Sequence, residues 1–179
     1  MGNVLAVCMC KNHQLSKKIV DFIFLVKGEG VEDDIHRGIT VQHQLGVKED
    51  PTQPNLRQVH LIQYELIQEL QNKGFDVKSG TLGENITTAG IELLSLPTGT
   101  IAHIGKEAKI EITGLRFPCV QINQYQKGLA AAVVERNENG KIVSKIGVMG
   151  VILKGGKVEA GDKIEVFLPP QPHKPLERV

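Results

Sequence analysis

Short apolar runs, each closed by a glycine turn, fill the C-terminal half of the chain. They cover residues 100–104, 108–113, 142–154 and 162–168. Such runs are typical of strands joined by tight turns. Regularly spaced short strands with few helices favour a closed or nearly closed antiparallel barrel over a βαβ fold. We therefore predict a mainly β, barrel-rich α+β fold with a few short helices.

The N-terminal half adds further strands and the clearest helix of the chain. Residues 1–10, 19–27 and 57–62 are predicted strands, because they are rich in β-branched and other apolar residues. Residues 64–72 place Leu66, Ile67 and Leu70 on one face and are followed by Gly74, which predicts an amphipathic helix. A second helix is expected over the alanine-rich residues 129–136.

A length of 179 residues suits one well-buried core. The proline-rich segment 169–175 is not expected to join a sheet. We therefore expect a single domain over residues 1–168 and an extended tail over 169–179.

The stretch Gly114-Leu115-Arg116-Phe117-Pro118-Cys119 stands where a strand pattern changes to a helical one. Gly114 is expected to end the strand, and residues 120–127 to form a short helix closed by Gly128. Pro118 extends the residue before it and so makes a sharp corner. Cys119 would then lie in the first helical turn, where the helix dipole and the charge of Arg116 favour the thiolate. That ionisation is what a nucleophile or a metal ligand requires.

A plainer interpretation is also open for each cysteine. A single cysteine near a strand end is often a packing residue, which would make Cys119 part of the core. Cys8 and Cys10 share one face of a strand, and no second Cys or His pair stands at zinc spacing. Three cysteines cannot form a complete set of disulfides, so we expect reduced thiols.

Charge and hydropathy exclude several classes of protein. The net charge is +1 and no basic stripe is visible, which argues against a nucleic-acid-binding protein. The longest apolar run is too short to cross a bilayer, and lysines follow the first apolar residues too soon for a signal peptide. We expect a cytoplasmic protein.

Two segments without clear periodicity carry polar groups. Residues 31–55 form a long predicted loop that contains His36 and Arg37, which are either functional or simply solvated. Residues 79–90 are rich in glycine and threonine. This composition is typical of anion-binding loops, but ordinary turns use the same residues.

Five motifs in sequence resemble the MOSC domain, which is named for the C-terminal part of molybdenum cofactor sulfurase. They are Asp34-Ile35-His36-Arg37-Gly38, Arg57-Gln58-Val59-His60-Leu61-Ile62, Leu82-Gly83-Glu84-Asn85-Ile86, Arg116-Phe117-Pro118-Cys119, and Gly147-Val148-Met149-Gly150 with Gly155 to Ile164. Each motif alone is short. Together they match the family in order from about Asp33 to Phe167, and the cysteine stands where the family keeps its own.

The resemblance implies a barrel-rich domain that binds the pyranopterin molybdenum cofactor or carries sulfur for it. It implies that Cys119 is either the protein ligand to molybdenum or the bearer of a persulfide. Both roles suit a soft thiolate. The candidate cofactor-binding residues are Arg116, Asn85, Glu84, Arg57, His36 and Arg37.

The family also suggests activities and partners. One is a small oxidoreductase acting on N-hydroxylated substrates. Another is a sulfur carrier served by a cysteine desulfurase or delivering to a molybdoenzyme. The alternative is a non-catalytic module that binds a pterin or another anion.

The chain departs from the usual family pattern in two respects. The segment Asp33-Asp34-Ile35-His36 differs from the family's usual Gly-Asp-x-His form, which bears on the role of the loop around His36. We also expect these 179 residues to contain neither the pyridoxal-phosphate-dependent domain of the sulfurases nor the N-terminal barrel of the amidoxime-type reductases. A second subunit of a homo-oligomer, or another protein, would then complete the site.

Overall fold

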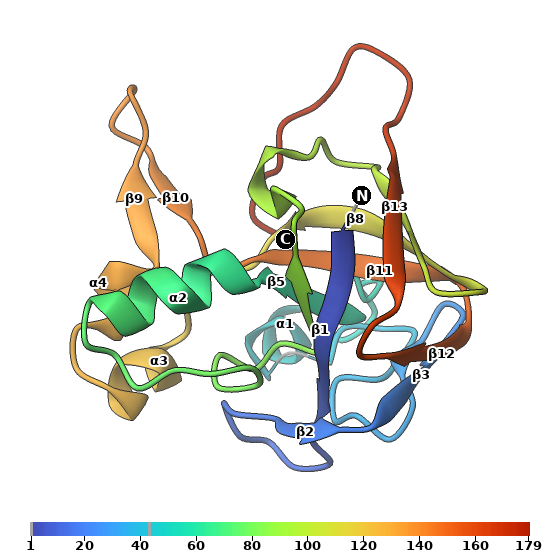
Figure 1. Cartoon of the computed structure of the whole chain (residues 1–179), viewed down its shortest axis with the longest axis horizontal. Helices are drawn as coiled ribbons and strands as arrows, with labels where there is room; N and C mark the ends of the chain where they lie inside the picture. Colours follow the sequence, from blue (N-terminus) through green and yellow to red (C-terminus); the bar gives the residue numbers. More distant parts are fainter. Residues whose placement is uncertain (1, 43) are drawn as a thin grey trace.

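The structure, a computed structural model, describes residues 2–42 and 44–179, without the side chains of 44–46. Its centre is a closed barrel of seven strands (Figure 1). In chain order these strands are β1 (Gly2–Met9), β5 (Val59–Gln63), β6 (Ile86–Ala89), β7 (Ile101–Ile104), β8 (Ala108–Leu115), β11 (Val148–Lys154) and β13 (Lys163–Phe167). Around the barrel they follow the order β13-β7-β8-β11-β5-β6-β1, and the pairing of β1 with β13 closes it. The predicted mainly β, barrel-rich fold is confirmed.

One pair of barrel strands is parallel, where an antiparallel barrel was predicted. Leu61 of β5 lies opposite Ile86 of β6 in parallel register. Parallel neighbours require a crossover connection, which α2 (Tyr64–Asn72) supplies together with the loop that follows it. The helix has the predicted bounds and buries Leu66, Ile67 and Leu70.

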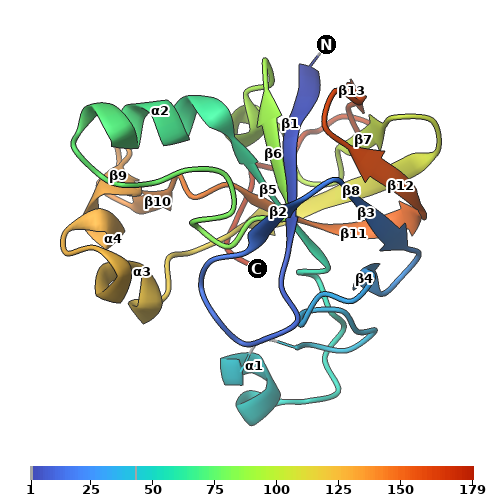
Figure 2. The ribbon, with the colours of Figure 1, turned by 60° about the horizontal axis from the view of Figure 1, so that its bottom comes forward.

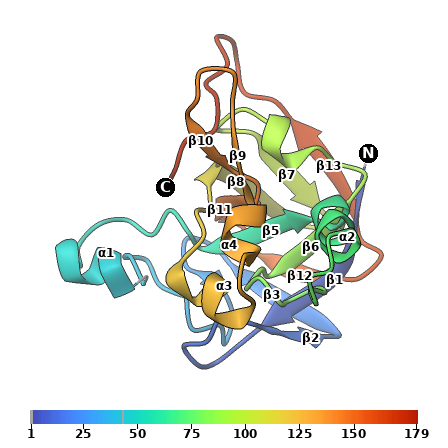
Figure 3. The ribbon, with the colours of Figure 1, turned by 90° about the vertical axis from the view of Figure 1, so that its left-hand side faces the viewer.

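The remaining elements surround the barrel. They are β2 (Lys18–Val20), β3 (Phe22–Val26), β4 (Gly30–Val31), α1 (Gln44–Glu49), η1 (Leu93–Ser95), α3 (Val120–Tyr125), α4 (Leu129–Ala132), β9 (Val134–Arg136), β10 (Ile142–Ser144) and β12 (Gly156–Glu159). Figure 2 shows α2, α3 and α4 along one side of the barrel. Figure 3 shows α1 standing apart from the barrel, on the long connection between β4 and β5. The predicted loop 31–55 therefore contains a helix, which is too short to give a periodic pattern.

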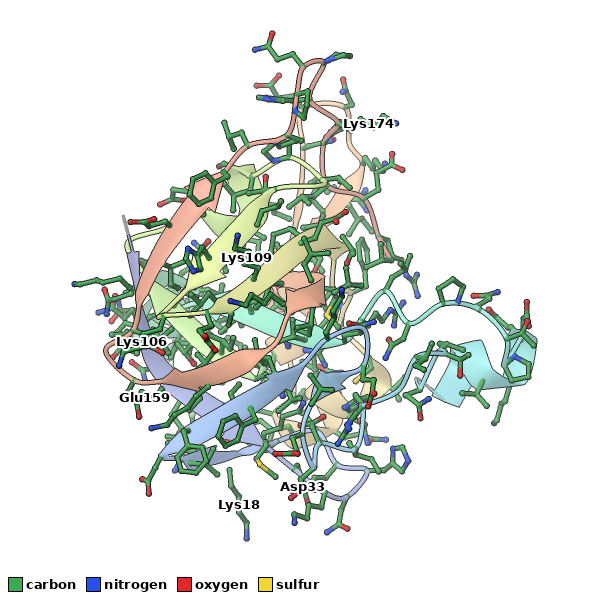
Figure 4. All side chains as sticks on the ribbon, turned by 90° about the vertical axis from the view of Figure 1, so that its right-hand side faces the viewer. Lys18, Asp33, Lys106, Lys109, Glu159 and Lys174 are labelled. Atoms are coloured by element: carbon green, nitrogen blue, oxygen red, sulfur yellow. The ribbon has the colours of Figure 1, made fainter. Side chains whose placement is uncertain are left out.

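Two apolar clusters hold these elements together. The larger fills the barrel with residues such as Val4, Leu61, Ile110 and Val148, all fully buried. The smaller joins α2 to the segments of α3 and α4, through residues such as Ile67 and Leu129. Charged side chains such as Lys106, Lys109 and Glu159 lie on the outside (Figure 4). This inside–outside division follows the alternation in the strands; in β8 buried and less buried positions alternate from Ala108 to Gly114.

Three predicted elements have different bounds in the structure. The helix expected over 129–136 ends at Ala132, and the β-branched residues that follow lead into the hairpin of β9 and β10. The strand expected over 142–154 is interrupted at Gly147, which has a φ of +93°. The strand expected over 1–10 is described from Gly2 onward, and Met1 lies outside the described residues.

The last residues of the chain, beyond the proline-rich segment 169–175, return to the barrel. Arg178 forms a parallel bridge with Leu115, and the Leu115 N–H donates to the Glu177 carbonyl at 2.7 Å. Gly114 makes this docking possible. A Cβ at residue 114 would lie 2.4 Å from the Glu177 oxygen and 2.6 Å from Val179 Cγ1. Gly114 therefore continues β8, where the sequence predicted a stop, and leaves room for the tail beside it.

Gly114→Ala is expected to displace the tail and to lower the free energy of unfolding by about 1–3 kcal/mol, the usual cost of overpacking. In a chain that lacks residues 176–179 the same substitution should cost far less, because the atoms nearest the added methyl group belong to the tail. Urea denaturation of the four proteins gives this double-mutant cycle. Equal costs in both backgrounds would show that the tail does not depend on Gly114.

Candidate functional site

Cys119 lies at a corner between the barrel and the short helix α3. The sequence predicted that it would lie in the first turn of this helix. In the structure it is the N-cap residue that directly precedes the helix, in extended conformation with φ −95° and ψ 170°. Its thiol faces the Gln121 side-chain oxygen at 3.7 Å and is partly exposed. The next residue, Val120, is 78% exposed. Cys119 is therefore half-buried, with one part packed against the smaller apolar cluster and another part open to solvent.

A cavity of about 460 Å³ opens beside this corner. That volume lies in the range of small-molecule and cofactor sites. Among the residues that line it are five of the predicted site residues, Cys119, Arg116, Asn85, Arg57 and His36. Four motifs that are far apart in the sequence thus meet at one cavity.

Two predicted cofactor-binding residues do not line the cavity. Arg37 pairs with Glu29, with 2.7 Å between its Nη2 and the carboxylate. Glu84 is fully buried behind the cavity, where its Oε1 accepts hydrogen bonds from the Gly80 N–H and the Thr87 hydroxyl. Burial raises the pKa of Glu84. The two residues support the loops of the site and do not face the cavity.

Gly83 allows the loop before Asn85 to pack closely against the segment that contains Leu15. The residue has a φ of +84°, in the left-handed region that favours glycine. A Cβ here would lie 2.6 Å from the Leu15 carbonyl oxygen. Any other residue would force apart two loops that both line the cavity.

A buried carboxylate, Asp34, connects these loops. Its Oδ2 accepts from Lys17 Nζ at 2.7 Å, from Asn85 Nδ2 at 3.1 Å and from the Cys10 N–H at 3.3 Å. Its Oδ1 accepts from the His36 N–H at 3.0 Å and lies 3.3 Å from His36 Nδ1. Burial raises the pKa of Asp34, but the His36 hydrogen bond and the charge of Lys17 outweigh it and hold that pKa well below its ordinary value.

The lining of the cavity is cationic. Lys17, Lys48, Arg57 and Arg116 line it, and no carboxylate does so within the part of the chain that the structure describes. Arg116 Nη1 donates to the Leu82 carbonyl at 2.6 Å. Burial lowers the pKa of Lys17, Arg57 and Arg116 alike, and in each case a nearby positive charge adds to the effect. Positive groups held in a concave surface attract anions.

Sequence reasoning did not single out the other residues that line the cavity, Lys17 and His60 among them. The Lys17 side chain is only 3% exposed, whereas the adjacent Lys18 is an exposed surface residue. Nothing local distinguishes the two lysines. His60 lies on β5 and is 3% exposed. Its position inside an apolar strand pattern could have indicated a buried polar side chain. Its Nε2 lies 2.7 Å from the Ile146 carbonyl oxygen, and its backbone N–H donates to Asn85 Oδ1.

The family model described as "MOSC domain" matches residues 43–165. The chain belongs to the MOSC domain family. The family is associated with the molybdenum cofactor. The resemblance stated on five motifs is confirmed, and the match contains four of the predicted site residues of the cavity, Arg57, Asn85, Arg116 and Cys119.

Solved structures show the same fold as this MOSC domain. The YuaD protein from Bacillus subtilis is 23% identical with a TM-score of 0.76, covering 95% of this chain and 98% of that one. YiiM from Escherichia coli is 19% identical with a TM-score of 0.65, covering 97% of this chain and 73% of that one. YiiM from Geobacillus stearothermophilus is 17% identical with a TM-score of 0.63, covering 93% and 75%. A comparison with curated proteins finds no match.

In the described part of this MOSC domain, no helix has the length and apolar character needed to span a membrane. Those residues also hold no group of three or more His, Cys, Asp and Glu side chains placed to bind a metal ion.

Iodoacetamide is expected to label Cys119 of the native MOSC domain and to leave Cys8 and Cys10 unmodified. Cys8 is fully buried and Cys10 is 8% exposed, and burial raises the pKa of the Cys8 thiol to about 12. Peptide mass spectrometry before and after unfolding measures the three thiols separately. If Cys119 were as unreactive toward iodoacetamide as Cys8, it would be a packing residue of the core.

Asp34→Asn is expected to destabilise the fold by about 3–5 kcal/mol, because it leaves the Lys17 ammonium buried and unpaired. Adding Lys17→Met should recover part of that loss. The folded pKa of Asp34 is depressed, so its stabilisation is present above the unfolded value of roughly 3.9 and is lost as the pH falls below it. Urea denaturation between pH 3 and pH 7 should therefore show a weaker acid dependence for Asp34→Asn. An unchanged dependence would contradict the assigned pairing.

Proposed function

We propose that the cavity binds a pyranopterin cofactor phosphate, with the Cys119 sulfur available to its molybdenum. The observation that carries the proposal is the meeting of the partly exposed Cys119 thiol with Arg57 and Arg116 at a single cavity. Guanidinium and ammonium groups bind phosphate through charge-assisted hydrogen bonds. Thiolate sulfur is a soft ligand that suits a metal–sulfur centre.

The residues present fit such a group. The lining offers cations for a phosphate and a partly exposed thiol for a soft metal. When bound, the cofactor would supply two-electron redox chemistry at its metal. The activity that we propose is reduction of an N–OH group to N–H and water, with two electrons from a separate electron-donor protein and two protons from solvent. The protein's own part is to hold the phosphate, to present the Cys119 sulfur and to limit access of water from the inner wall.

A second role, sulfur carrier, is favoured by the position of Cys119 at the edge of the cavity. Val120 and Gln121 beside it are exposed, so a partner protein can approach the thiol. A Cys119 thiolate would attack the terminal sulfur of a persulfide on a cysteine desulfurase. The new S–S bond forms on Cys119 as the donor's S–S bond breaks, and the donor leaves as a thiolate.

Cys119→Ser is expected to lower molybdenum retention at least about tenfold, since a hydroxyl is a poor ligand for a soft metal. The chain is incubated anaerobically with isolated cofactor, separated by gel filtration, and assayed for metal. Gln121→Ala is the matched control, because Gln121 lines the same cavity and contacts the thiol without being a soft ligand. The control should retain the native amount of metal.

Equal metal retention by Cys119→Ser and the native chain would remove the thiol from the ligand role. The sulfur-carrier role is measured on the same proteins after incubation with a cysteine desulfurase and its substrate. A mass increase of one sulfur atom is expected on the peptide that contains Cys119, and its absence would count against this role. Salt should weaken pterin phosphate binding, because the proposed phosphate contacts are ionic.

A further inference from the structure

The corner that presents Cys119 is held by hydrogen bonds at its two ends and by side-chain packing between them. The Arg116 N–H donates to the Gly147 carbonyl at 3.1 Å, and the Cys119 carbonyl accepts a hydrogen bond at 3.2 Å from the first turn of α3. Between these points Pro118 has no N–H to donate. Within the described residues, the N–H groups of Phe117 and Cys119 donate to no other backbone group. The position of the corner therefore depends on what the Phe117 side chain contacts.

The last residues of the chain lie against this side chain. The Leu115 N–H donates to the Glu177 carbonyl at 2.7 Å, and the Val179 N–H donates to the Leu115 carbonyl at 3.4 Å. Arg178 lies between these two contacts, with its Cζ 5.2 Å from the centre of the Phe117 ring. This distance is in the range of a cation–π contact. In residues 2–42 and 44–179 no carboxylate forms an ion pair with Arg178, so the ring does not compete with a carboxylate for the guanidinium.

Phe117 connects the tail to the site. It lines the cavity beside Cys119, and it also lines a second cavity of about 730 Å³, which Arg178 lines as well. Burial, the larger cause, and the charge of Arg178 both lower the pKa of Arg57, which lines the first cavity. The tail is thus close to the site in contact and in charge. A displacement of the tail would free the ring that stands two residues before the thiol.

We propose that Arg178 is a positioning residue of the site, because it stacks on the Phe117 ring and so holds the Cys119 corner in place. The C-terminal residues are then a strap across the corner. This inference goes beyond the proposed function, since it concerns how the thiol is held, whichever ligand or partner the thiol meets. Loss of the strap lets the corner move away from the smaller apolar cluster and exposes more of the half-buried Cys119.

The rate at which iodoacetamide alkylates Cys119 measures this exposure in the full chain. Arg178→Gln removes the cation from the Phe117 ring, and Arg178→Lys keeps one. Lys174→Gln is the matched control, because Lys174 is a cation of the same tail and lines the same second cavity. In the described part of the chain Lys174 makes no cation–π contact. Peptide mass spectrometry gives the rate for each cysteine, and the fully buried Cys8 reports whether the fold is retained.

Arg178→Gln is expected to raise the Cys119 rate about twofold to fivefold, the factor that corresponds to an exposed cation–π contact. Cys8 should stay unreactive. Arg178→Lys and Lys174→Gln should both react at the native rate. Deletion of residues 176–179 should raise the rate at least as much as Arg178→Gln does. In a Phe117→Leu background, which has no ring, Arg178→Gln should have no further effect.

An unchanged Cys119 rate in folded Arg178→Gln would overturn the proposal. A slower rate would also overturn it, because loss of a cation that acts directly on the thiol disfavours the thiolate and slows alkylation. An equal effect of Arg178→Gln with and without the Phe117 ring would show that Arg178 does not act through that ring. These measurements use no pterin, phosphate or metal, so their failure leaves the proposed function to its own test.

Discussion

The buried ion pair between Lys17 and Asp34 is the constraint on which the site depends. Two charges taken from water are costly unless both are paired and the remaining hydrogen-bonding positions are filled. Asp34 meets that condition with donors from Cys10, His36 and Asn85 as well as Lys17. Since these donors come from separate segments, satisfying one carboxylate fixes the end of β1, the loop around His36 and the loop after Gly83 relative to one another. Asn85 extends the same network to His60 on β5.

The barrel supports this network without containing the cavity. Its interior is filled by apolar side chains such as Leu61, Ile86 and Ile110, as expected for a small closed barrel. A ligand site must then lie outside the packed interior, where loops and strand ends meet. The cavity is lined from such places, with Arg57 before β5, Asn85 before β6 and Arg116 directly after β8. The apolar interior stabilises the barrel, whereas the polar network joins the loops that line the cavity.

Features with local causes could be predicted from the sequence, and those with distant causes could not. The helix over residues 64–72 and the strands could be predicted because the spacing of apolar residues within each segment indicates its secondary structure. The Arg-Phe-Pro-Cys corner was likewise visible, and Cys119 was misplaced by a single position. The parallel pairing of β5 and β6 and the return of the tail to Leu115 depend on residues far apart in the chain. The burial of Lys17 likewise depends on Asp34, which is distant in the sequence. Glu84 belongs to the same motif as Asn85 but is fully buried behind the cavity, and a motif alone does not show which of its residues line a cavity.

The residues that line the cavity differ in exposure and in chemistry. Cys119 is partly exposed, whereas His60 is almost completely buried. A simple anion would use the cations alone and would not need the thiol. A ligand that carries both an anionic group and a soft metal–sulfur part would contact the cations and the Cys119 sulfur together. Because the two kinds of group line one cavity, such a ligand would gain affinity over an anion that pairs with the cations alone.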